Sequence, residues 1–100
     1  MHPKILWPNN KRFAFTIFDD TDRANLKDNQ LVYRCLDELN FKTTKSTWVS
    51  KSNKSHEDSG ITCEDKIYLK WLLELKNKGF EIGYHNTTYH SSYRQDIEKG

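Results

Sequence analysis

The chain has few cysteines, few glycines and prolines, and no long apolar run. Its 100 residues include two cysteines, four glycines and two prolines. Cys35 and Cys63 are too few for a disulfide framework and too far apart for a cysteine-based metal site. Two reduced thiols are the simplest interpretation, and a single disulfide between them is the alternative. Neither state of the cysteines identifies the cellular compartment. No segment approaches the roughly 20 apolar residues of a membrane-spanning helix, so we expect no membrane partner.

A strong charge of one sign is also lacking. The 16 basic and 14 acidic residues are interspersed and leave a net charge of +2. A nucleic-acid-binding domain would show clustered Lys and Arg, so we expect no nucleic-acid partner. No apolar signal segment follows Met1, which favours a cytoplasmic location. Aromatic side chains make up 13% of the chain, more than a disordered segment carries, so a folded domain with a small core is expected.

Three short segments are typical of β-strands. Residues 13–18 form an almost continuous apolar run before a polar stretch, as in a strand buried on both faces. Residues 42–49 are rich in Thr and end in Trp48 and Val49, which also favours a strand. Residues 80–84 form the third predicted strand.

Helices are predicted between these strands. Residues 28–40 carry apolar side chains at helical spacing, with Asp28 or Asn29 as the first cap and Asn40 as the end. Their predicted buried face consists of Leu31, Val32, Cys35, Leu36 and Leu39. The second helix follows a capping-box pattern at Thr62 and Asp65 and ends at Gly79. Its predicted buried face consists of Ile67, Tyr68, Trp71, Leu72 and Leu75.

The order of these elements predicts an α/β fold. Strands that alternate with helices, here β-α-β-α-β, indicate a parallel sheet. Residues 51–59 are polar and suit a surface loop, and a third helix is expected near residues 93–99. Because the chain stops inside that helix, we expect residues 1–100 to be one partial domain. Its open sheet edges would favour self-association.

Side chains suited to metal chemistry follow the first and third predicted strands. Asp19 and Asp20 follow the first strand, and His85 and His90 follow the third. In parallel α/β folds these strand ends share one rim, where ligands bind. Two imidazoles and a carboxylate suit a catalytic zinc site, and the second carboxylate can act as a base. Taken separately, an aspartate pair also suits a turn or helix cap, and histidine pairs are frequent on surfaces.

The same residues resemble a known family. Residues 13–20, F-A-F-T-I-F-D-D, resemble the first motif of NodB-type polysaccharide deacetylases, a strand that ends in T-F-D-D. Residues 79–85, G-F-E-I-G-Y-H, are similar to the family's second motif, G-H-E-I-G-x-H. The order and separation of the motifs also match, and the resemblance spans roughly residues 11–95.

The resemblance implies a role for each of these residues. Asp19 matches the catalytic base, and Asp20, His85 and His90 match the metal ligands. The family hydrolyses the amide C–N bond of N-acetylated carbohydrates with metal-activated water, and the metal here is most simply Zn²⁺. Its fold is a distorted (β/α) barrel, of which this chain would be the N-terminal part.

The chain departs from the family pattern at three points. Thr21 stands where the family usually has glycine after the aspartate pair. Four residues separate His85 from His90, whereas the family usually has three. The later family motifs, which supply an arginine and a general-acid histidine, would lie beyond Gly100.

Two aromatic residues are candidates for substrate binding. Trp48 and Tyr84 lie at the ends of the second and third predicted strands, where aromatic rings can stack on sugars. Core packing is the alternative for Trp48. Two alternatives to the enzyme remain: a non-catalytic carbohydrate-binding or interaction remnant of the same fold, and a small α/β domain without a metal.

Overall fold

The structure is a computed structural model that describes residues 2–52 and 56–100. Residues 53–55, inside the predicted loop 51–59, lie outside the described residues. The described elements follow the predicted β-α-β-α-β order after a short 3-10 turn. They are η1 (Pro8–Asn10), β1 (Phe18–Asp19), α1 (Leu26–Glu38), β2 (Thr44–Trp48), α2 (Lys66–Asn77), β3 (Glu81–Asn86) and α3 (Arg94–Lys99).

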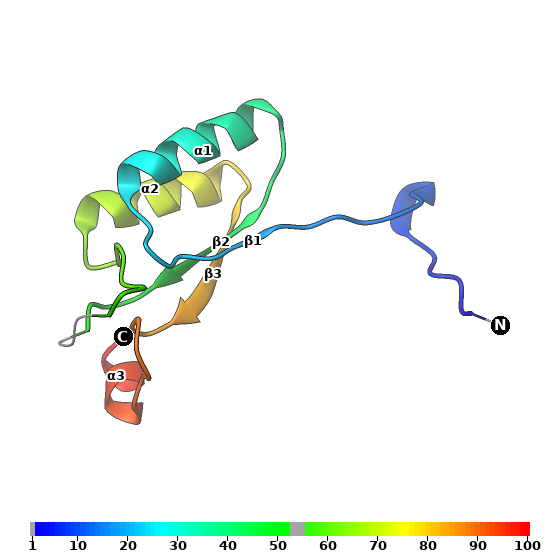
Figure 1. Cartoon of the computed structure of the whole chain (residues 1–100). Helices are drawn as coiled ribbons and strands as arrows, with labels where there is room; N and C mark the ends of the chain where they lie inside the picture. The colour runs from blue at the N-terminus through cyan, green and yellow to red at the C-terminus, as the bar shows by residue number, and fades with distance from the viewer. Residues whose placement is uncertain (1, 53–55) are drawn as a thin grey trace.

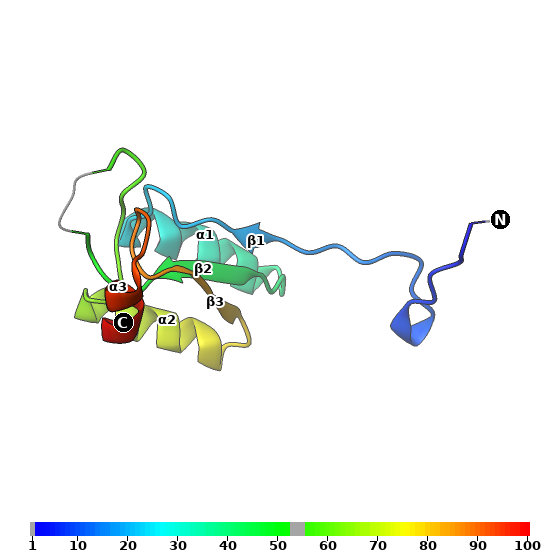
Figure 2. The same cartoon turned by 90° about the horizontal axis from the view of Figure 1, so that it is seen from below.

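The three strands form one parallel sheet in the order β1-β2-β3, which confirms the predicted α/β class. Phe18 pairs with Thr44, and Thr44 pairs with Glu81, so all three strands begin level with one another. Helices α1 and α2 lie on one face of the sheet, and α3 lies beyond the carboxyl ends of β2 and β3 (Figure 1). Figure 2 shows the opposite face, which no helix covers in the described part of the chain.

The first strand differs from its prediction. Only Phe18 and Asp19 pair with β2, and the preceding residues extend away from the body of the molecule as an arm (Figure 2). Phe13 and Phe15 are 76% and 71% exposed, so a strand over 13–18 buried on both faces is wrong. The reason is the length of the partner strand. β2 begins at Thr44, level with Phe18, and the N–H of Thr44 bonds to the carbonyl of Ile17, but β2 does not extend far enough to pair with residues 13–16.

Helix α1 begins earlier than predicted and ends where predicted. Asn25, rather than Asp28 or Asn29, is the N-cap, and its side chain accepts a hydrogen bond from the backbone N–H of Asp28 at 2.9 Å. At the other end Asn40 adopts φ 51°, and the N–H of Phe41 donates to the carbonyl of Leu36 at 2.8 Å. This left-handed residue closes the helix, as the sequence predicted.

Of the predicted buried face of α1, only Leu36 packs against the core, where it is partly buried. Leu31, Val32 and Leu39 are 65%, 54% and 71% exposed, and Cys35 is also exposed. Tyr33 is the buried residue of this helix, at 2% exposure. The sheet reaches only as far as the short β1, so the apolar stripe on the far side of α1 has nothing to pack against in the described residues.

Helix α2 supplies most of the core. Asp65 is its N-cap and accepts hydrogen bonds from the N–H groups of Ile67 and Tyr68, each at 2.9 Å. Ile67, predicted as buried, is 70% exposed because it faces away from the sheet. The other four predicted residues are buried. The core consists of Tyr33, Tyr68, Trp71, Leu72, Leu75 and Phe80.

Strand β3 is longer at its carboxyl end than predicted. Gly79 takes φ +96°, which an L-residue adopts only with strain, and ends α2 as expected. The strand then runs from Glu81 to Asn86, so His85 belongs to the strand itself. The strand backbone therefore fixes the position of the His85 ring, which was expected near the start of a loop.

The N-cap of α2 offers a test of this fold. Asp65→Ala removes the acceptor of two backbone N–H groups, and we expect a loss of about 1 kcal/mol in the free energy of unfolding. Urea unfolding followed by circular dichroism measures this change. Asp65→Ser, which keeps a capping oxygen, should lose much less; equal losses in the two variants would contradict the capping role.

Candidate metal-binding rim

The structure brings together two residues that lie on opposite edges of the sheet. Asp20 follows β1, His85 lies near the end of β3, and β2 runs between them. His85 Nε2 lies 2.8 Å from Asp20 Oδ1. A register shift between β2 and β3 beside Thr47 and Trp48 accompanies this approach. Both side chains keep access to solvent, at 30% exposure for His85 and 64% for Asp20.

Asp22 joins this pair. Asp20, Asp22 and His85 each offer one ligand atom, and the three atoms lie within 4.8 Å of one another. Sequence reasoning missed Asp22, which stands in the polar stretch after the aspartate pair. We call this group the rim cluster.

The turn that carries Asp22 is braced by a distant segment. The N–H of Arg23 donates to the carbonyl of Asp58 at 3.2 Å, and the N–H of Ile61 donates to that of Ala24 at 2.9 Å. A Cβ on Gly60 would lie 2.7 Å from the backbone nitrogen of Ala24, so only glycine permits this close approach. The residues just before α2 therefore help to set the position of Asp22.

Asp19 points away from the rim cluster. It pairs with Lys45, and successive side chains of a strand point to opposite faces, so Asp19 lies on the face that carries the helices. Its Oδ2 accepts a hydrogen bond from the hydroxyl of Tyr33 at 2.7 Å and lies 3.5 Å from Lys45 Nζ. The carboxylate of Asp19 thus lies on the helix-bearing face of the sheet, and the carboxylate of Asp20 lies on the opposite face with His85.

Lys45 and Tyr33 are the two residues of this network that sequence reasoning missed. The Lys45 side chain is 0% exposed, and its Nζ also donates to the carbonyl of Ser46 at 3.0 Å. Burial lowers the pKa of Lys45 because it disfavours the ammonium, and the nearby carboxylate of Asp19 opposes that shift. Burial is also the main cause that raises the pKa of Tyr33.

His90 lies near the rim cluster but outside it. Its Nδ1 is 2.6 Å from the carbonyl oxygen of Ser91. It lines a cavity of about 230 Å³ together with His85, Asp22 and His56. The structure therefore brings Asp20 and His85 into contact and places His90 on the wall of the same hollow.

The two predicted substrate-binding aromatics are placed differently. Trp48 is buried, at 2% exposure, and its ring packs edge-on against the rings of His85 and Tyr89, with centroids 5.5 and 5.4 Å apart. Tyr84 is 60% exposed, and its hydroxyl shares a hydrogen bond with Thr87 at 2.6 Å. Trp48 thus packs against the imidazole of His85 as a buried side chain. The ring of Tyr84 is accessible to solvent.

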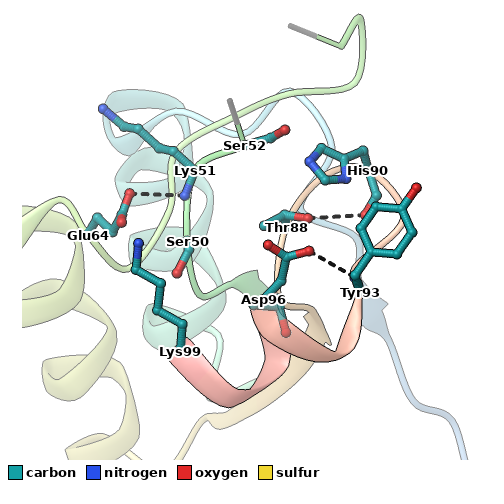
Figure 3. A pocket seen from close by; sticks show the side chains of 10 residues that line it. Ser50, Lys51, Ser52, Glu64, Thr88, His90, Tyr93, Asp96 and Lys99 are labelled. Atoms are coloured by element: carbon teal, nitrogen blue, oxygen red, sulfur yellow. Dashed lines mark hydrogen bonds between the residues drawn. The ribbon is translucent and has the colours of Figure 1, made fainter. Parts of the chain in front are cut away.

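A second cavity of about 340 Å³ adjoins the first, and Thr88 and His90 line both. Figure 3 shows it between the segment after β2 and the start of α3. Its two carboxylates are already engaged by backbone N–H groups: Glu64 accepts from Lys51 at 3.0 Å and Asp96 from Tyr93 at 2.8 Å (Figure 3). The cavity mixes hydroxyls, cations and acceptors, a lining that suits polar ligands.

No protein-family model, no curated protein and no solved structure matches this chain. Among the described helices, none has the length and apolar character needed to span a bilayer.

The buried Lys45 predicts a pH dependence of stability. The unfolded lysine keeps its proton up to a pH of about 10.4, whereas the folded state releases it at lower pH. The unfolded state then binds more protons, so the free energy of unfolding should rise with pH up to that value. Urea unfolding between neutral pH and pH of about 10 should show a smaller rise in Lys45→Met. The exposed Lys70→Met is the control, and an unchanged rise in Lys45→Met would contradict the assignment.

Proposed function

We propose that this chain is the N-terminal part of a NodB-type polysaccharide deacetylase, a metal-dependent hydrolase that removes acetyl groups from N-acetylated carbohydrates. The observation that carries the proposal is the 2.8 Å approach of His85 to Asp20 across the sheet. Both belong to the motifs that resemble the family, and they meet at the strand ends where parallel α/β folds bind ligands. The three-stranded sheet is proposed as the first part of a distorted (β/α) barrel.

The donor set fits a divalent ion. Imidazole suits Zn²⁺ and its neighbours, and carboxylates add hard oxygen ligands; we propose Zn²⁺, with Asp20 and His85 as ligands. His90, through the family resemblance, and Asp22, through its place in the rim cluster, are the two candidates for the third ligand. A remaining position open to solvent is what a catalytic site requires.

The chemistry is hydrolysis of an acetamide. A bound divalent ion would supply a water molecule whose pKa is near neutral. By the family resemblance, Asp19 would take a proton from that water as the water oxygen attacks the carbonyl carbon. Because its side chain lies on the face opposite the rim cluster, it would first have to turn towards the metal. The C–N bond then breaks, acetate forms, and the sugar amine takes up a proton. In the described part of the chain Asp19 Oδ2 contacts Tyr33 and Lys45, and a turn of the side chain towards the rim cluster would break both contacts.

The substrate would lie across the two adjoining cavities. An N-acetyl group at the rim cluster would stand beside His85, and the sugar would extend towards the polar cavity behind Thr88 and His90. Tyr84 keeps its predicted substrate-binding role only as an exposed ring, since it lines neither cavity, and Trp48 contributes by packing against the imidazole of His85.

A second candidate function is favoured by the network around Asp19. A carboxylate that accepts from Tyr33 and pairs with the buried Lys45 can hold β1 onto the helices instead of moving a proton. The chain would then be a non-catalytic carbohydrate-binding or interaction remnant of the same fold. A third candidate is a small α/β domain that binds no metal. Measuring the metal content distinguishes it from the proposed deacetylase.

Metal content tests the site. Elemental analysis of protein purified without chelator or affinity histidines should find about one equivalent of divalent metal. His85→Ala and Asp20→Ala should lose it, and His56→Ala, on the wall of the same cavity, should keep it. Comparing Asp22→Ala with His90→Ala identifies the third ligand. Absence of metal from folded wild type, reconstituted with Zn²⁺, would refute the proposal.

Asp19→Asn tests the base. The variant should keep its metal and lose turnover of an N-acetylated oligosaccharide by roughly 10²–10⁴-fold, the usual contribution of a general base. Normal turnover in Asp19→Asn would show that another group takes the proton. Wild type that binds both metal and sugar but releases no acetate would favour the non-catalytic candidate.

A further inference from the structure

The outer edge of β1 has unpaired backbone groups. The carbonyl of Ile17 accepts from the N–H of Thr44 at 3.1 Å, so Ile17 directs its backbone groups towards β2. Backbone groups of successive strand residues point alternately to the two sides. Ala14, Thr16 and Phe18 therefore present their N–H and C=O groups outward, where the described chain provides no partner.

An apolar stripe runs beside this edge. Phe13, Phe15 and Ile17 are alternate residues of an extended segment and so share the face that carries the helices. The ring of Phe15 contacts that of Phe41, with centroids 5.9 Å apart. Phe13 and Phe15 are nevertheless more than two-thirds exposed. An open edge lined with exposed aromatic side chains is a template for pairing with another strand.

We propose that a second copy of this chain pairs with this edge, and that residues 13–17 of the two copies run antiparallel about a two-fold axis at Phe15. In this register Phe15 faces Phe15 of the partner copy, and Phe13 faces the partner's Ile17. Ala14 and Thr16 face each other and exchange backbone hydrogen bonds, as their outward orientation requires. The segment is thus complementary to itself, as a two-fold interface must be.

Charge and shape support the same register. Continued outward, it places Lys11 opposite Asp19 of the partner copy. Lys11 would join Lys45 as a second cation beside this carboxylate, whose Oδ2 already contacts Lys45 and Tyr33. It also places Phe13 beside the partner's Ile17, which lines an apolar cavity of about 370 Å³ with Val32 and Leu36. One register therefore pairs the backbone, matches the charges and directs an aromatic ring towards the cavity.

The exposed aromatic side chains of the arm would supply about half of the area of a standard interface. The exposed parts of Phe13, Phe15 and Phe18 amount to roughly 400 Å² per copy, taking about 200 Å² for each ring. A standard interface buries about 800 Å² per partner. The paired backbone and the exposed side chains of α1 beside the cavity are available for the remainder, among them Val32, at 54% exposure.

Light scattering coupled to size exclusion tests the dimer on the whole chain. Wild type should have the mass of two chains, and Phe15→Asp, which sets two carboxylates face to face, should be a monomer. Leu73→Asp, at an exposed apolar residue of α2, should stay dimeric. Lys11→Asp should raise the dissociation constant at least tenfold, and Lys4→Asp, on the same arm outside the paired segment, should not. Monomeric wild type, or dimeric Phe15→Asp, would overturn the proposal.

Cysteine cross-linking tests the register. In a background with the exposed Cys35 changed to Ser, Phe15→Cys should form a disulfide between copies. Its Cα atoms would lie about 4.5 Å apart in a non-hydrogen-bonded pair, within the range of disulfides. Thr16→Cys, which faces Ala14, should cross-link far less, and equal yields would overturn the register. The rim cluster is untouched in all these variants, so metal content reports on the proposed function separately.

Discussion

The alignment of Asp19 with Lys45 is the interaction on which the rest of the structure depends. β1 has only two residues, too few for backbone pairing alone to hold it. Tyr33 and Lys45 bind the carboxylate of Asp19, and Ser46 Oγ donates to its carbonyl at 2.7 Å. With Asp19 fixed towards the helices, strand alternation turns Asp20 to the other face, where His85 lies. A buried lysine thus sets the geometry of the exposed rim.

The sequence predicted the order of elements and the parallel sheet because these depend on local signals. Gly79 and Asn40 end their helices through backbone conformations that few residues adopt easily. Burial depends on distant partners, and there the predictions failed. The apolar residues 13–18 and the stripe on α1 were expected to be buried, but periodicity shows only that a face is apolar. It does not show whether another element covers that face.

The same distinction applies to the site. The position of Asp20 and His85 after parallel strands predicted a shared rim, and the structure brings the two side chains together. Asp22 could not be predicted because its position depends on the turn braced at Gly60. Lys45 has the composition of an exposed strand residue, and its burial follows from its pairing with Asp19. Alternation along β2 gave no signal either, because Ser46 and Trp48 on the other face are also buried.

The rim and the outer edge of β1 are linked through this short strand. A strand paired at Ala14, Thr16 and Phe18 would extend β1 from two residues to a full-length strand and restrict the turn that carries Asp20. A metal ion at the rim cluster would restrict the same turn from its other end. Each event would then favour the other, because both bind the ordered form of one segment. The link would be direct, because Asp20 follows Asp19, the last residue of β1, in the chain.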